Sequence, residues 1–209
     1  MTGDGPMTGD GPETAGPGGS AGQLAVSQLA GALDATGQLI ATVPAARWAD
    51  PTPCPGWMVR DLVAHLVTGN ARFAGEFGSA YQPPNSQDLT AGTELLSAYR
   101  DSAAALLEAI GQPGAIEQIV TVPFGTVPGI VALHLRITEV LVHGWDLATA
   151  TGQLVTFSED VAEQELAFSR DKLAEIPPGR RPFAPPQPVA DDAPAIDRLA
   201  ACLGRTVAG

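Results

Sequence analysis

Apolar residues recur at helical spacing in four long stretches of this chain. The pattern predicts helices over about 23–44, 57–78, 90–110 and 127–151. In the second stretch the apolar positions from Val59 to Val67 follow the i, i+3, i+4, i+7, i+8 spacing of an amphipathic helix. Four helices of this length, with short or crossover connections, predict an all-α four-helix bundle.

The remaining segments predict shorter elements. A short strand is expected at 116–122, followed by a turn at 123–125, and the fourth helix is expected to start at Thr126 and to stop at Gly152. Further helices are predicted at 158–175 and 192–204, and the proline-rich 177–188 between them predicts no regular structure. The predicted organisation is a disordered Gly/Pro-rich tail at 1–22, a bundle at 23–155, and a C-terminal extension at 156–209 that packs on the bundle.

The fourth helical stretch is apolar on nearly every side except along one narrow seam. Arg136, Glu139, His143 and Asp146 fall within roughly a quarter-turn of each other at about 100° per residue. A helix apolar all round is typical of the protein interior, where charge is costly unless it is paired or binds a metal. Glu139 and His143 have the four-residue spacing of two ligands for one metal ion.

A metal site in a bundle needs a further ligand from a facing helix. His134 lies roughly opposite the seam, so His65 on the second helix is the candidate. His65, Glu139 and His143 would leave coordination positions open, as catalytic zinc sites do. Asp61 and Asp146, each about one turn from a histidine, are predicted to orient the two imidazoles.

The same residues permit simpler interpretations. A buried ion pair between Arg136 and Glu139 explains the seam without a metal. His134 is interpreted as a structural histidine and Cys54, between two prolines, as a packing residue rather than a nucleophile. Trp57 and Trp145 are expected to be core or pocket-wall aromatics. Gly144, inside the helix at a cost of about 1 kcal/mol relative to alanine, predicts close packing there.

Charge and cysteine content narrow the possible functions. The net charge of -12 leaves no basic patch for nucleic acid or for an anionic membrane surface. The two cysteines are far apart in sequence and no secretory segment is recognised, so a disulfide framework is not expected. For the same reasons we expect a cytoplasmic location.

Two sequence motifs resemble a known family. TPCPGW at 52–57 with VRDLVAHL at 59–66, and EVLVHGWDLA at 139–148, are similar to the two signatures of actinobacterial DinB/YfiT-like metal-binding proteins. These are relatives of the N-terminal domain of mycothiol-dependent maleylpyruvate isomerase, and the chain resembles their stand-alone short branch. The closing Asp197-Arg198-Leu199 and Gly204-Arg205 also resemble that branch, so the similarity extends over about 23–205.

The resemblance implies a DinB-type bundle in which His65, Glu139 and His143 bind a divalent metal, zinc or alternatively nickel. It further implies mycothiol as a thiol cosubstrate, and a small-molecule electrophile as its partner. A thiol S-transferase is expected rather than maleylpyruvate isomerisation, because only two short helices are predicted after the bundle. Arg136 is a candidate anchor for a carboxylate of thiol or substrate, with an internal salt bridge as the alternative. A non-catalytic metal- or ligand-binding protein of the same fold is the competing interpretation, and a homodimer is left open.

Overall fold

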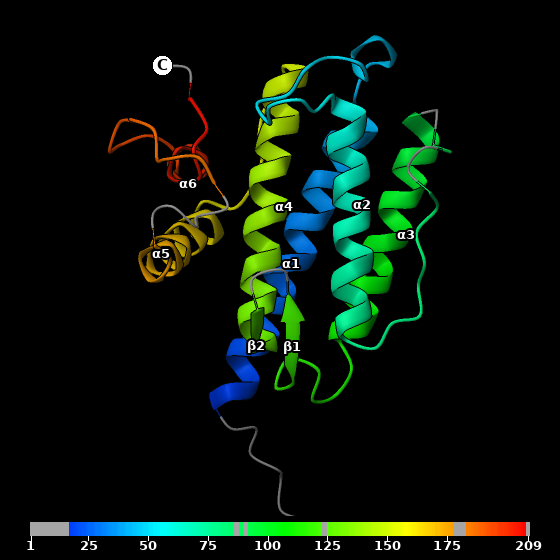
Figure 1. The fold of residues 1–209 in the computed structure, drawn as a ribbon, viewed down its shortest axis with the longest axis vertical. Coiled ribbons are helices and arrows are strands. Elements are labelled where there is room, and N and C mark those ends of the chain that lie inside the picture. The colour runs from blue at the N-terminus through cyan, green and yellow to red at the C-terminus, as the bar shows by residue number, and fades with distance from the viewer. Residues whose placement is uncertain (1–16, 86–87, 90–91, 123–124, 178–182, 208–209) are drawn as a thin grey trace, which may run out of the picture.

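Four long helices pack side by side and form the body of the protein (Figure 1). The computed structural model describes residues 17–85, 88–89, 92–122, 125–177 and 183–207. The body consists of α1 (Pro17–Ala41), α2 (Val59–Glu76), α3 (Gly92–Ile110) and α4 (Gly129–Thr151). Helix α1 contacts α3 and α4, and α2 contacts the same two, which closes the four into a bundle. The expected all-α four-helix bundle is thereby confirmed.

The interior of the bundle is built mainly from aliphatic side chains, as the low aromatic content requires. Leu29, Leu62, Leu106 and Leu133, one from each helix, are fully buried or nearly so. Each lies on the apolar stripe of its helix, and burying such side chains supplies most of the driving force for folding. Helix α4 is buried on most of its circumference, as its sequence predicts.

The proline-rich segment before α2 forms a turn that the sequence encodes directly. The Trp57 amide donates to the Cys54 carbonyl at 3.1 Å, and Gly56 has a φ of 81°. Proline followed by glycine at the two central positions is the signature of a type II turn, which needs a positive φ at the second. Thr52 secures the base of the loop, because its amide donates to the Trp57 carbonyl at 2.9 Å. The turn therefore fixes where Cys54 and Trp57 lie.

The connection between α3 and α4 differs from the prediction. Strand β1 (Ile119–Val122) pairs antiparallel with β2 (Gly125–Pro128), and α4 begins at Gly129 rather than at Thr126. Pro128 is extended and precedes the helix. The residues of β2 prefer the hairpin because strand pairing satisfies their backbone groups. The expected end of α4 is confirmed by Gly152, whose φ of 70° is the left-handed conformation that glycine favours after a helix.

The predicted boundary at residue 22 between the N-terminal tail and the first helix is wrong. Helix α1 begins at Pro17, so 17–22 is helical rather than disordered. The rest of the predicted tail, at 1–16, lies outside the described residues.

The C-terminal segment lies against one side of the bundle, along α4 (Figure 1). It contains α5 (Glu159–Glu175), capped by the Ser158 side chain, and α6 (Ala195–Cys202). Trp145 on α4 donates from its indole Nε1 to Asp197 of α6 at 2.6 Å. Ile196, Leu199 and Leu203 are buried, as the sequence predicts. Within the described ranges, none of the helices is both long enough and apolar enough to cross a membrane.

Candidate metal centre

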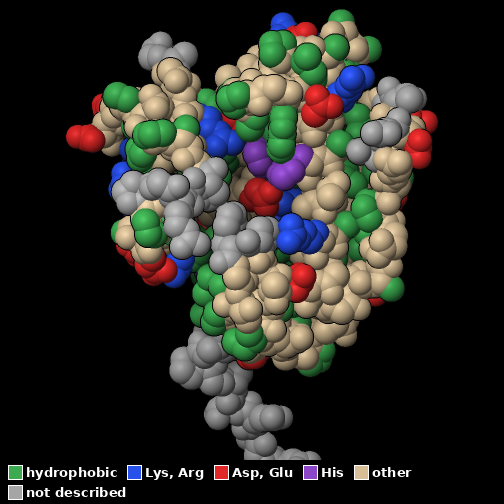
Figure 2. Space-filling model, viewed as in Figure 1, with side chains coloured by type: hydrophobic (Ala, Val, Ile, Leu, Met, Phe, Trp, Pro, Cys, Tyr) green, Lys and Arg blue, Asp and Glu red, His purple; other side chains and the backbone are tan. Residues whose placement is uncertain are grey.

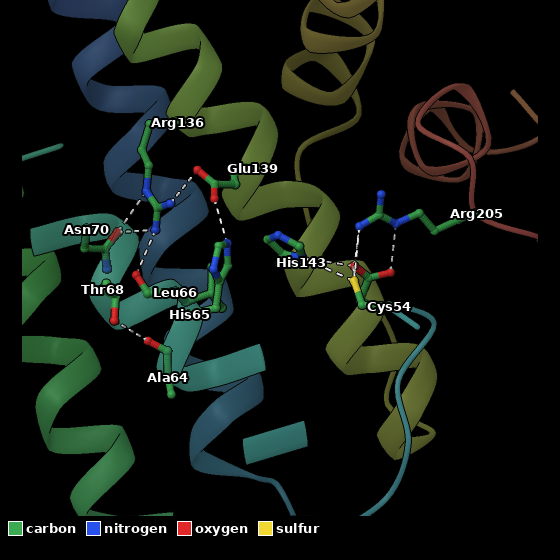
Figure 3. A network of polar contacts seen from close by, with 11 residues as sticks. Cys54, Ala64, His65, Leu66, Thr68, Asn70, Arg136, Glu139, His143 and Arg205 are labelled. Atoms are coloured by element: carbon green, nitrogen blue, oxygen red, sulfur yellow. Dashed lines mark hydrogen bonds and ion pairs between the residues drawn. The ribbon is translucent and has the colours of Figure 1, made fainter. Parts of the chain in front are cut away.

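His65 from α2 and Glu139 and His143 from α4 meet where the two helices face each other (Figure 3). His65 Nε2 lies 2.8 Å from Glu139 Oε1, and ligand atoms of all three side chains lie within 4.8 Å of one another. The two imidazole centroids are 5.0 Å apart, nearly edge to face. The structure thus brings together the three residues that the sequence singled out.

The donor set fits a divalent ion. Ligand atoms around a tetrahedral zinc are roughly 3.3 Å apart, given bond lengths of about 2.0–2.2 Å, so small side-chain shifts suffice here. His143 Nδ1 lies 3.1 Å from Asp146 Oδ2, which leaves Nε2 as the nitrogen available to a metal. Burial lowers the pKa of His143, which favours the neutral imidazole that a metal requires.

Arg136 fixes the position of Glu139 and is fully buried. Its guanidinium donates to Glu139 Oε2 at 2.8 Å, to the Leu66 carbonyl at 2.9 Å and to Asn70 Oδ1 at 2.6 Å. Burial by itself raises the pKa of Glu139, but the Arg136 charge and the neighbouring imidazoles outweigh it and hold that pKa well below its usual range. Of the two roles considered for Arg136, the contacts support an internal salt bridge with Glu139. The alternative role as a carboxylate anchor is wrong, because its donors are committed and it does not line the cavity.

A second group of polar residues continues from His143 toward the C-terminus (Figure 3). Asp146 is fully buried and accepts from Arg205 at 2.9 Å and from the Cys54 thiol at 3.1 Å. Burial alone would raise the pKa of Asp146, but hydrogen bonds from His143 and Arg205 lower it. Asp146 thus contacts the imidazole of His143 and is itself held by Arg205, whereas its support of a metal ligand stays a prediction.

Cys54 and Arg205 take part in the site, although no chemical role was predicted for either from the sequence. Burial, followed by the charge of Asp146, raises the pKa of the Cys54 thiol to about 12. Cys54, His143 and Asp146 also have ligand atoms within 4.8 Å of one another. Arg205 donates to both Cys54 and Asp146, so this group already contains its own cation. In the sequence, Arg205 was noted only because the closing Gly204-Arg205 resembles the family.

Asp61 does not orient His65. Its carboxylate accepts the Met58 amide at 3.0 Å and lies 3.7 Å from Arg60, and no contact with His65 is found among the described residues. Asp61 is in the first turn of α2, where a carboxylate satisfies a free amide and opposes the helix dipole. The prediction for Asp61 is wrong because it considered only the spacing to His65 and not the Met58 amide, which competes for the carboxylate.

Aromatic and small residues shape the rest of the site. The Trp57 ring lies 4.6 Å from His65 and 5.9 Å from His143, so Trp57 is a wall of the site, whereas Trp145 is buried. A Cβ on Gly144 would come within 2.4 Å of Phe157, which confirms the close packing predicted there. His134 Nδ1 lies 2.7 Å from the buried Glu165 of α5, away from the candidate ligands, in agreement with a structural role.

A cavity of about 550 Å³ opens beside the three candidate ligands. Figure 2 shows histidine side chains next to an acidic one in a hollow of this face. The bundle forms one wall, and α5 with the C-terminal segment forms the other. A three-residue donor set at the end of a cavity is the arrangement expected where a small molecule reaches a metal.

Fold and site define a DinB-type helical bundle that brings two histidines and a glutamate together beside a cavity. Residues 29–148 match the model of the mycothiol maleylpyruvate isomerase N-terminal domain. Because that match covers more than half of the chain, the protein belongs to this family.

Similar proteins agree with the assignment. An uncharacterized protein of Mycobacterium tuberculosis is 39% identical over 178 residues, covering 84% of this chain and 94% of the relative. A second uncharacterized protein of that species is 33% identical over 147 residues, covering 61% of this chain and 56% of the relative. The crystal structure of the mycothiol-dependent maleylpyruvate isomerase superposes with a TM-score of 0.54 at 18% identity, covering 70% of this chain and 68% of that chain. This last likeness establishes the fold, and the relatives place the family in actinobacteria.

Proposed function

We propose that the protein binds one divalent metal ion, zinc or alternatively nickel, through His65, Glu139 and His143. The observation that carries the proposal is the convergence of these ligand atoms within 4.8 Å from two different helices. An ion pair between Arg136 and Glu139 accounts for one edge of the cluster only. The ion pair does not explain why two imidazoles lie next to the same carboxylate, whereas a metal ion bound by all three side chains does explain it.

The surrounding residues support metal binding by limiting the freedom of the ligands. Arg136 holds one oxygen of Glu139, Asp146 holds one nitrogen of His143, and Trp57 packs on both imidazoles. Such partners orient metal ligands and are worth about 10- to 100-fold in metal affinity or activity. Three protein ligands leave a position for a further ligand, and the adjoining cavity supplies access to it.

We further propose that this ligand is the thiol of a small molecule and that the protein is a transferase-like enzyme. The family is named for a mycothiol-dependent enzyme, and mycothiol is accordingly the thiol to test first. A bound divalent cation lowers the pKa of a thiol and makes the thiolate available at neutral pH. The residues of this chain would bind the two reactants side by side, with Trp57 and Pro53 excluding water from one wall.

A non-catalytic binding protein of the same fold is the second candidate. It is favoured by Cys54, because burial and Asp146 raise the pKa of this thiol to about 12 and leave no thiolate of the protein's own beside the candidate ligands. Turnover with a thiol and an electrophile separates the two, since a binder would retain affinity for the thiol without forming product.

Calorimetric titration of mycothiol into the metal-loaded protein tests the proposal. Binding that disappears after chelation and returns with zinc is expected. Binding of equal strength in the chelated protein, or none in either form, would contradict a metal-held thiol. Asp61→Asn is the matched control for changes near the site. This exposed carboxylate accepts the Met58 amide at the N-terminal end of α2 and contacts none of the candidate ligands.

A further inference from the structure

Two buried carboxylates of the candidate metal centre are each paired with an arginine. Arg136 donates to Glu139 Oε2 at 2.8 Å, and the Arg136 side chain is fully buried. Arg205 donates to Asp146 Oδ2 at 2.9 Å and to Asp146 Oδ1 at 3.2 Å, so both oxygens of that carboxylate accept from one guanidinium. In the view of Figure 3 the two arginines lie on either side of the two candidate histidines.

The charges of these two pairs cancel. Glu139 is balanced by Arg136 and Asp146 by Arg205. Burial by itself lowers the pKa of Arg205, but Asp146 raises it further, so this cation persists. The Cys54 thiol, whose pKa is raised to about 12 by burial and by Asp146, is neutral at neutral pH, and histidines bind a metal as neutral imidazoles. A divalent ion held by the three candidate ligands would therefore keep its full double positive charge.

The cavity walls screen the charge of a bound ion only weakly. Leu135 of α4 and Phe168 and Leu173 of α5 line the cavity beside the candidate ligands. Between apolar walls, opposite charges attract each other more strongly than in water. The protein as a whole has a net charge of -12 and repels anions, so an anion that binds here depends on local positive charge.

We infer that Arg136 and Arg205 raise the affinity of the candidate metal centre for an anionic ligand, because they cancel the charges of the two neighbouring carboxylates. The ligand class is a small monovalent anion, and a thiolate is the member of this class that the proposed function requires. The inference rests on the metal binding of the proposed function but not on thiol transfer.

Azide binding to the cobalt-loaded protein tests this charge balance at Arg205, whose side chain is 11% exposed, whereas that of Arg136 is fully buried. Cobalt(II) accepts the same imidazole and carboxylate ligands as zinc, and its visible absorption changes when a further ligand binds. Each variant is titrated first with cobalt and then, at saturating cobalt and neutral pH, with azide. Arg205→Met removes one positive charge. It is expected to weaken azide binding about tenfold or more without lowering the affinity for cobalt.

Two further variants separate the charge of Arg205 from its contacts, and circular dichroism checks that each is folded. Asp146→Asn leaves Arg205 unbalanced, so azide binding is expected to strengthen while cobalt binding weakens. The double variant Asp146→Asn/Arg205→Met loses one charge of each sign, so its azide affinity should return close to that of wild type.

Two other patterns would overturn the inference. If Arg205 only positions its neighbours, all three variants would lose affinity for cobalt and azide alike. If the guanidinium of Arg205 itself binds the anion, the double variant would bind azide as weakly as Arg205→Met does.

Arg198→Met is the matched control, because it changes the net charge of the protein by the same amount. Arg198 lies on α6 in the same C-terminal segment, where it donates to Glu163 and to the Ala193 carbonyl. It is expected to change neither affinity, and a loss of azide binding equal to that of Arg205→Met would contradict a local effect.

The cobalt titration distinguishes failure of this inference from failure of the proposed function. Wild-type protein that binds no cobalt would overturn both. Cobalt binding with the same azide affinity in all variants would overturn the inference alone, and absence of thiol transfer would leave the azide pattern intact.

Discussion

Asp146 is the residue through which the C-terminal segment acts on the candidate metal centre. Its carboxylate joins Arg205 to His143, and it is fully buried. Asp146→Asn keeps the shape but removes the charge that holds the imidazole. We expect zinc affinity, measured by competition with a chromophoric chelator, to fall about 10- to 100-fold. The matched control Asp61→Asn should leave affinity unchanged, and equal affinities for all three proteins would show that Asp146 does not support a metal ligand.

Cys54 offers a test of the local electrostatics. With its pKa raised to about 12 by burial and by Asp146, the thiol should remain protonated at pH 8. In metal-free Cys202→Ser protein, alkylation by iodoacetamide should therefore be slower than in the same protein unfolded in urea. The expected ratio is about 100-fold or more, because an unperturbed cysteine has a pKa of about 8.5. A native rate close to the unfolded rate would contradict the assigned environment and reopen a nucleophilic role.

At the scale of elements, the contact between α2 and α4 depends on a glycine. A Cβ on Gly69 would lie 2.4 Å from Arg136 Nη1, and that guanidinium is held by Asn70, Leu66 and Glu139. Relief of the clash would therefore break hydrogen bonds of a buried cation. Gly69→Ala should lower the free energy of unfolding by about 1–3 kcal/mol, although alanine favours a helix.

Gly75→Ala, in the same helix with nothing within 4 Å of the added Cβ, is the matched control. Urea denaturation should show it unchanged or slightly stabilised. If both variants gain stability alike, Arg136 is free to move and does not fix Glu139.

The elements that the sequence predicts well are those with one dominant pattern. Helices α2 and α4 have long runs of apolar residues at helical spacing. The Cys54–Trp57 turn is specified locally, because Pro55 followed by Gly56 favours a type II turn. Strand β2 was missed because four residues with a proline give little periodicity, and its pairing with β1 depends on partners elsewhere in the chain. The start of α4 was misplaced for the same reason.

The candidate site was predictable where its residues share a helix face or where the chain offers few residues of the required type. Glu139 and His143 are spaced by the helix itself, and His65 followed from the scarcity of histidines. Asp61 was misassigned because its backbone partner lies within the same turn. Cys54 and Arg205 were missed because 151 residues separate them, and only the folded chain brings them together.

At the scale of the whole molecule, bundle and C-terminal segment enclose the cavity between them. Residues of α2 and α4 supply the candidate ligands, and α5 with the following segment supplies much of the apolar wall. The net charge of -12 creates a field around the protein that disfavours the approach of anionic ligands.

The central claim is that His65, Glu139 and His143 hold one metal ion, and elemental analysis of the purified protein tests it most directly. Wild type should carry about one divalent ion per chain, and His65→Ala and His143→Ala should lose it while the helical circular dichroism persists. His134→Gln, on the same helix as His143 but paired with Glu165, should retain the ion. Equal metal content in wild type and all three variants, or no metal after supply of zinc, would contradict the account and reduce the cluster to an ordinary buried ion pair.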